Sequence, residues 1–201
     1  MPDSNSKHHN PWKIIDGNRV FDCPYFNIRV DTVSLNGRPE RPYNSIRMKK
    51  SGVAIVPIDN DGNTILVGQY RYVLDRFTWE VTRGGGRLDA PAIESAKAEL
   101  LEETGYNARH WLQIFEASAS PGISDEVAPG FAAWGLEGSA PRPDDGELLF
   151  TKRMPFAEAV SLALSGQVAD LASMALLLAI EARARRGDLP ADLLRLLGRG
   201  G

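Results

Sequence analysis

The feature that most constrains folding is a run of three glycines between a short apolar segment and an expected helix. Residues 78–81 have the composition of a strand and lead directly into the sequence Arg-Gly-Gly-Gly at 83–86. Asp89 can then cap a helix with Pro91 in its first turn. Apolar residues at helical spacing follow, and Gly105 is typical of a helix end. The pattern predicts a strand, a tight turn and one helix in succession.

Three acidic residues of this expected helix, Glu99, Glu102 and Glu103, lie at positions i, i+3 and i+4. Their carboxylates therefore fall on one side of the helix. Because like charges repel, such a face is either solvated or neutralised by a hard cation such as Mg²⁺ or Mn²⁺. Composition alone leaves both interpretations open. The adjacent glycines favour the cation, because they let a backbone closely approach a metal-bound phosphate.

Residues 84–106 resemble the Nudix box, whose pattern is Gly, five residues, Glu, seven residues, Arg-Glu-aliphatic-x-Glu-Glu-x-Gly-aliphatic. The matching residues are Gly84, Glu99, Leu100, Glu102, Glu103 and Gly105, with Tyr106 in the last apolar place. Ala90 and Ala98 stand where the pattern has Glu and Arg. The resemblance implies that those two side chains normally pair and brace the loop, so their joint loss removes a brace and not the metal site.

The resemblance extends over about residues 12–180 and is to the ADP-ribose and nucleotide-sugar pyrophosphatase branch of this superfamily. It rests on Gln-Tyr-Arg at 69–71, Trp-Glu at 79–80, and Pro121, sixteen positions after Gly105. It implies Mg²⁺- or Mn²⁺-dependent hydrolysis of a nucleoside diphosphate linked to a sugar. The products would be a nucleoside monophosphate and a sugar phosphate.

The resemblance also implies roles for individual residues in metal binding. Glu99 and Glu103 would be metal ligands, and Glu102 would join them or order nearby water. The backbone carbonyl of Arg83 would be an additional ligand.

The general base of this branch is expected on an acidic loop after the box, and residues 144–147 lie at the matching place. Glu147 is the first candidate for the base or for a late-arriving metal ligand, and Asp145 is the second. A solvated turn is the alternative interpretation.

Four residues are candidates for substrate binding. Arg71 could hold a phosphate or a terminal ribose through its planar guanidinium, although it could equally be a surface residue. Trp12 and Tyr43 could stack on a base, and burial in a small sheet explains both equally well. Glu126 could line the substrate pocket or be merely a loop acid.

The order of elements predicts an α+β chain, because strand-like runs come first, one helix lies between them and helices come last. The resemblance specifies a Nudix-type α/β/α sandwich with a mixed central sheet, plus a small N-terminal β segment. The expected parts are a disordered N-terminus at 1–11, a β segment at 12–48 that dimerises, and a Nudix hydrolase domain at 49–201.

Composition excludes several classes of protein. The 201 residues carry 23 basic and 26 acidic side chains, and a net charge of −3 argues against gripping nucleic-acid phosphates. The most apolar run, 174–180, is too short to cross a bilayer, and Cys23 is the only cysteine. We therefore expect a cytoplasmic homodimer that acts on a small molecule and binds neither nucleic acid nor membrane.

Two other functions stay open. The loss of the brace at Ala90 and Ala98 also suits a weakly active or inactive Nudix-fold module that binds a nucleotide derivative. Within enzymes, the substrate could be another diphosphate, such as a dinucleotide or a coenzyme A derivative.

Overall fold

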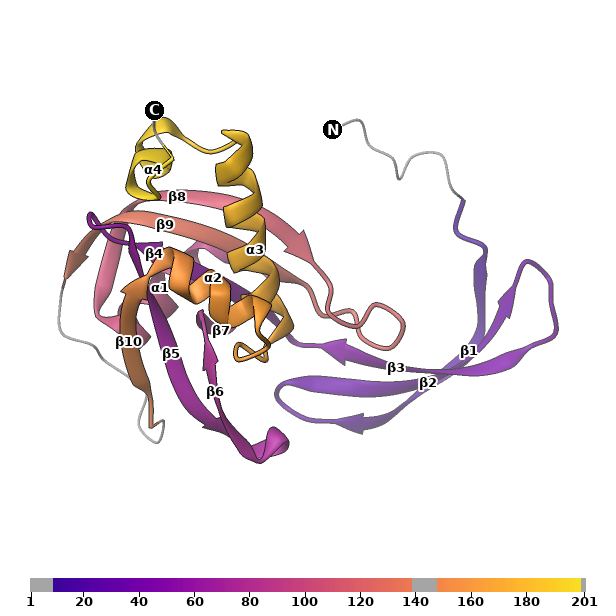
Figure 1. Cartoon of the computed structure of the whole chain (residues 1–201). Coiled ribbons are helices and arrows are strands. Elements are labelled where there is room, and N and C mark those ends of the chain that lie inside the picture. Colours follow the sequence, from indigo (N-terminus) through magenta and orange to yellow (C-terminus); the bar gives the residue numbers. More distant parts are fainter. Residues whose placement is uncertain (1–8, 139–147, 200–201) are drawn as a thin grey trace. The chain divides into compact units, whose positions relative to one another are not determined.

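The computed structural model describes residues 9–138 and 148–199 (Figure 1). Within these limits the chain divides into two compact units. One contains the residues up to Lys49 together with the loop Ser120–Glu126, and the other contains Lys50–Ala119 and the residues from Val127 onward. The first unit holds the expected N-terminal β segment, and it also includes a loop from far along the chain.

The first unit is a three-stranded antiparallel sheet in the order β1-β2-β3. Its strands are β1 (Trp12–Asp22), β2 (Phe26–Leu35) and β3 (Arg41–Met48). The turn after β2 has positive φ at both Asn36 (50°) and Gly37 (72°). This is the conformation that favours the Asn-Gly dipeptide in hairpins.

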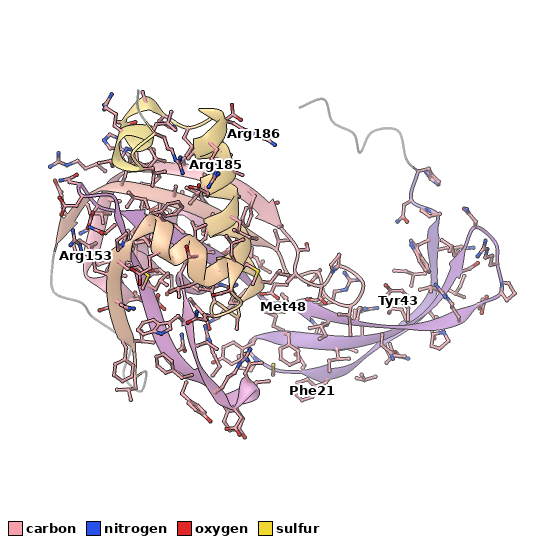
Figure 2. All side chains as sticks on the ribbon, in the orientation of Figure 1. Phe21, Tyr43, Met48, Arg153, Arg185 and Arg186 are labelled. Atoms are coloured by element: carbon pink, nitrogen blue, oxygen red, sulfur yellow. The ribbon has the colours of Figure 1, made fainter. Side chains whose placement is uncertain are left out.

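The loop Ser120–Glu126 is attached to β3 by hydrogen bonds. The Ile46 amide donates to the Ile123 carbonyl oxygen at 2.8 Å, and the Tyr43 hydroxyl donates to the Gly122 carbonyl oxygen at 2.7 Å. Tyr43 is labelled on its strand in Figure 2. The loop thus extends the edge of the first unit.

The second unit contains a seven-stranded mixed sheet and four α-helices. The sheet has the order β10-β5-β4-β9-β8, with β6 beside β5 and β7 beside β4, and β4 is parallel to β9. In chain order the elements are β4 (Lys50–Ile58), β5 (Asn63–Arg71), the 3-10 turn η2 (Tyr72–Leu74), β6 (Arg76–Glu80), β7 (Thr82–Arg87), α1 (Ala92–Thr104), β8 (Tyr106–Ala117), β9 (Ala128–Gly138), β10 (Phe150–Pro155), α2 (Phe156–Leu164), α3 (Leu171–Arg186) and α4 (Ala191–Leu196).

The central strand β4 is buried on both faces, so its alternating side chains serve two cores. Val53 and Ile55 pack with Leu100 of α1 on one face. Val56 packs with Leu177 of α3 on the other, in a cluster that also includes residues of α2 and α4. Figure 1 shows α3 lying across the sheet. The expected α/β/α sandwich with a mixed sheet is confirmed. Among the described residues, no helix is long and apolar enough to cross a membrane.

Two local expectations around the glycines were wrong. The segment 83–86 is not a tight turn, because it lies in β7, where Gly85 pairs with Gly52 of β4. Asp89 does not cap α1: the N-cap is Pro91, without a side-chain hydrogen bond. Both carboxylate oxygens of Asp89 instead accept hydrogen bonds from the Arg87 guanidinium, at 2.8 and 2.6 Å.

Leu100→Ala should lower the free energy of unfolding by about 2–5 kcal/mol, because Leu100 is fully buried between α1 and the sheet. Leu164→Ala is the matched control at the end of α2, where the side chain is 72% exposed, and should change stability by less than about 0.5 kcal/mol. Urea unfolding of both variants measures the difference. Equal losses would contradict the assignment of this core.

Candidate active site

The glycines of β7 allow α1 to lie directly against the strand. A Cβ atom on Gly84 would stand 1.8 Å from the carboxylate carbon of Glu99, and one on Gly86 would stand 2.3 Å from Ser95 Oγ. Real Cβ atoms essentially never approach other heavy atoms so closely, so a side chain at either position would displace the helix residues. Glycine at these two positions therefore leaves room for the Glu99 carboxylate and the Ser95 side chain.

Two carboxylates of α1 meet consecutive residues of β7. Glu99 lies against Gly84, and Glu103 Oε2 accepts a hydrogen bond from the backbone N–H of Arg83 at 3.2 Å. Glu103 is only 8% exposed, whereas the sequence predicted an exposed helix face. Glu102 is half-buried. A carboxylate buried to this extent needs hydrogen bonds or positive charge nearby to offset its lost hydration.

The donor chemistry of this site suits a hard divalent cation. Carboxylate oxygens of Glu99 and Glu103, and the backbone of Arg83, are the type of ligand that Mg²⁺ and Mn²⁺ prefer. In the described part of the chain, no three Asp, Glu, His or Cys side chains converge in a geometry that could hold a metal ion. The expected convergence of three glutamates is thus absent from this conformation, although two of them border the same backbone.

An ion pair between the partly exposed Arg71 and the buried Glu80 lies on the neighbouring strands. The Arg71 guanidinium holds both carboxylate oxygens of Glu80, with an Nε–Oε1 distance of 2.8 Å, and the Thr78 hydroxyl donates to Glu80 Oε1 at 2.7 Å. Burial raises the pKa of Glu80, but hydrogen bonds from Arg71 and Thr78, with the charges of Arg71 and Arg83, outweigh it and lower the pKa below its ordinary value. Glu80 is therefore ionised at neutral pH. The hydrogen bonds to Glu80 in turn raise the pKa of Arg71.

A second ion pair connects β7 to the first turn of α3. The Arg83 guanidinium pairs with Asp170 Oδ1, and Asp170 Oδ2 accepts from the Ser173 amide at 2.7 Å and from the Ser173 hydroxyl at 2.6 Å. The Ser173 hydroxyl oxygen accepts a hydrogen bond from the Val81 amide at 3.1 Å. Asp170 thus caps α3 and holds Arg83 at the same time. The sequence signal for this role is an Asp immediately before the apolar run that begins at Leu171, a typical N-cap position.

The relatives of this chain include two ADP-ribose pyrophosphatases and one protein with a different name. No family model matches the chain. The ADP-ribose pyrophosphatase of Mycobacterium tuberculosis is 36% identical over 135 residues, which cover 65% of this chain and 64% of that protein. A methanol dehydrogenase activator of Bacillus methanolicus is 30% identical over 125 residues (62% and 66%). The ADP-ribose pyrophosphatase of Bacillus subtilis is 28% identical over 161 residues (79% and 86%). The chain covers slightly less than two thirds of the length of the first two relatives.

A solved structure, the crystal structure of an ADP compounds hydrolase, has the same fold. It superposes with a TM-score of 0.79 at 21% identity and covers 92% of this chain and 100% of that chain. The box residues lie on β7 and α1 of this shared fold, and the relatives include two ADP-ribose pyrophosphatases. These findings support the resemblance to the ADP-ribose pyrophosphatase branch of the Nudix superfamily.

The segment that resembles the Nudix box departs from the pattern at Ala90 and Ala98. Ala98 is exposed and Ala90 is half-buried, so neither position is closed off by packing. The same loop carries the exposed pair of Arg87 and Asp89. Exposed ion pairs of this kind contribute at most about 1 kcal/mol to stability. The bracing role of the residues that the pattern has at positions 90 and 98 stays a prediction.

Three candidate substrate residues belong to the first unit. The rings of Trp12 and Tyr43 meet edge to face, with centroids 5.5 Å apart, and the Arg41 guanidinium lies 5.2 Å from the centroid of the Trp12 ring. Glu126 is half-buried, and its amide donates to Ser124 Oγ at 3.0 Å. Their roles in substrate binding stay predictions.

The two candidate bases, Glu147 and Asp145, lie outside the described residues. Their assignment therefore stays a prediction. Arg71 is described, and its guanidinium is engaged by Glu80.

Gly84→Ala should abolish Mn²⁺ binding, because the added methyl group would displace the Glu99 carboxylate. Gly85→Ala is the matched control on the next residue, where the nearest atom to the added Cβ, Lys50 Cδ, lies at an ordinary 3.6 Å. Isothermal titration with Mn²⁺ measures both variants. If Gly84→Ala binds Mn²⁺ as tightly as Gly85→Ala, Glu99 is not a ligand.

Proposed function

We propose that the protein is a Mg²⁺-dependent pyrophosphohydrolase that cleaves a nucleoside diphosphate linked to a sugar, of the ADP-ribose or nucleotide-sugar type. The observation that carries the proposal is the pair of carboxylates, Glu99 and Glu103, held against the backbone of Arg83 and Gly84. Relatives named ADP-ribose pyrophosphatase support the same reaction.

The reaction adds water across the P–O–P bridge, giving a nucleoside monophosphate and a sugar phosphate. When bound, a divalent cation neutralises the phosphate oxygens and lowers the pKa of a coordinated water. Glu99, Glu103 and the Arg83 carbonyl would hold the cation, and Glu102 would join them or order nearby water. Glu147, or failing that Asp145, would accept the proton from the attacking water.

Arg71 is part of this proposal as a substrate-binding residue. Two of its nitrogens hold Glu80, and the side chain is still 38% exposed. A guanidinium anchored in this way is already oriented, so it loses little freedom when it meets a phosphate or a ribose. The stacking of a base on Trp12 or Tyr43 and the lining role of Glu126 complete the proposed substrate set.

The test of the reaction is a screen of diphosphate substrates with Mg²⁺ and with Mn²⁺ that scores the release of a nucleoside monophosphate. It includes ADP-ribose, nucleotide sugars, dinucleotides and coenzyme A derivatives, so that it separates the substrate classes. A protein that binds one of these compounds and hydrolyses none would be a nucleotide-binding module instead.

Glu103→Gln should reduce kcat by more than about a hundredfold. This loss is larger than the one expected when a residue that only holds a metal ligand is replaced. The fold should persist, because glutamine has the same shape and its carbonyl oxygen can still accept from the Arg83 amide. Glu94→Gln is the control on the same helix, where Glu94 is exposed and pairs with Lys97. Steady-state rates at limiting Mg²⁺ compare the two variants. Near wild-type turnover in Glu103→Gln would refute the ligand assignment.

A homodimer is also part of the proposal, because the first unit has little core of its own. In its described residues, Val33 is the only buried apolar side chain, while Ile14, Val20, Phe21 and Tyr25 are about half exposed or more. Three strands without a covered face are marginal in water. The segment 12–48 would be covered by a second copy and would help to wall its substrate site. The single cysteine, Cys23, suits the reducing cytoplasm in which we place this dimer.

Light scattering at micromolar concentration should give twice the mass of one 22.0 kDa chain. The double variant Ile14→Asp, Phe21→Asp should shift the protein toward the monomer, because it places charges in the apolar surface. Arg38→Asp, at the exposed turn of the same sheet, should leave the mass unchanged. A monomeric wild type would refute the dimer without affecting the proposed reaction.

A further inference from the structure

Three residues just before the first box glycine, Glu80, Val81 and Arg83, are held by side chains from other elements. The Glu80 side chain is held by Arg71, and the Val81 amide donates to Ser173 Oγ. At Arg83 the amide donates to Glu103, and the guanidinium pairs with Asp170. The position of this short segment therefore depends on both α1 and α3.

The pair of Arg83 and Asp170 is the largely buried part of this network. The two side chains are 20% and 19% exposed. Arg83 Nε is buried without a hydrogen-bond partner in the described part of the chain, so the guanidinium is held through its terminal nitrogen by Asp170. Ion pairs screened from water hold their geometry better than exposed pairs such as Arg87 with Asp89.

Asp170 has more contacts than a helix cap requires. Capping α3 uses only Oδ2, which accepts from the Ser173 amide, and Ser or Asn could supply such an oxygen. The other carboxylate oxygen, Oδ1, and the negative charge of Asp170 bind the Arg83 guanidinium. The capping role and the role toward β7 can therefore be separated by substitution.

We propose that Asp170 is a positioning residue for the metal site. It fixes the Arg83 side chain and thereby orients the residue 83 backbone, whose amide holds Glu103. This inference rests on the proposed function, because it assumes that Glu103 and the Arg83 carbonyl bind the cation. It gives a residue at the N-terminus of α3, outside the segment 84–106, a role in metal affinity.

Asp170→Asn and Arg83→Gln should each weaken Mn²⁺ binding by about tenfold, the effect typical of losing a residue that orients a metal ligand. Both keep the α3 cap, since Asn retains a capping oxygen. The double variant should be no weaker than either single variant, because both substitutions break one link. Titration of the substrate-free protein with Mn²⁺ measures all four proteins. Turnover at saturating Mg²⁺ should recover most of the wild-type kcat.

Asp192→Asn is the control for replacing an acid at the start of a helix. Asp192 lies in the first turn of α4 and accepts from Trp134 Nε1 at 2.8 Å, away from the Nudix box. The Asp192→Asn variant should bind Mn²⁺ as tightly as the wild type. Urea unfolding in metal-free buffer provides the second readout, in which Asp170→Asn and Asp192→Asn should differ little.

Two results would overturn the positioning role. One is unchanged Mn²⁺ affinity in Asp170→Asn while the wild type binds Mn²⁺ and hydrolyses a diphosphate, which leaves the proposed function intact. The other is additive losses in the double variant, which would mean independent effects of the two residues. A wild type that neither binds Mn²⁺ nor hydrolyses any diphosphate would overturn both proposals.

Discussion

The close approach of α1 to β7 is the constraint on which the candidate site depends. Glu99 occupies the space that a side chain on Gly84 would need, and Ser95 does the same at Gly86. A side chain at either position would displace the Glu99 carboxylate or the Ser95 side chain from its present place. The approach brings the helix carboxylates to the strand backbone, and the proposed cation site depends on this contact.

The charges around this contact form a linked set. Arg71 pairs with Glu80 and Arg83 pairs with Asp170, while Glu103 is held by a backbone amide. Two cations thus face three carboxylates, and the charges of Asp170 and Glu103 also act on Arg71. An excess of carboxylates over cations in this region favours the binding of a divalent cation.

The mixed sheet determines which helix can take part in the site. Because β4 is buried on both faces, α1 covers one face and α2, α3 and α4 share a core on the other. The first turn of α3 nevertheless reaches the β6–β7 segment through Asp170 and Ser173. The site is thus supported by helices from both layers of the sandwich.

The sequence by itself determined the features that depend on near neighbours. The hairpin turn at Asn36 and Gly37, the helix that carries Glu99 and Glu103, and its end at Gly105 follow from turn chemistry and periodicity, which act over a few residues. The resemblance to the Nudix box also assigned the proposed metal-binding carboxylates to this one helix, because the box is one continuous segment.

Only the tertiary structure decided how distant segments meet. It made residues 83–86 a strand, because β4 offers them backbone partners, and it buried Glu103 against Arg83. It also joined Arg83 to Asp170 across 87 positions of the chain. Contacts over such separations depend on the order of strands in the sheet and on which face each helix covers, and no local pattern of residues specifies either.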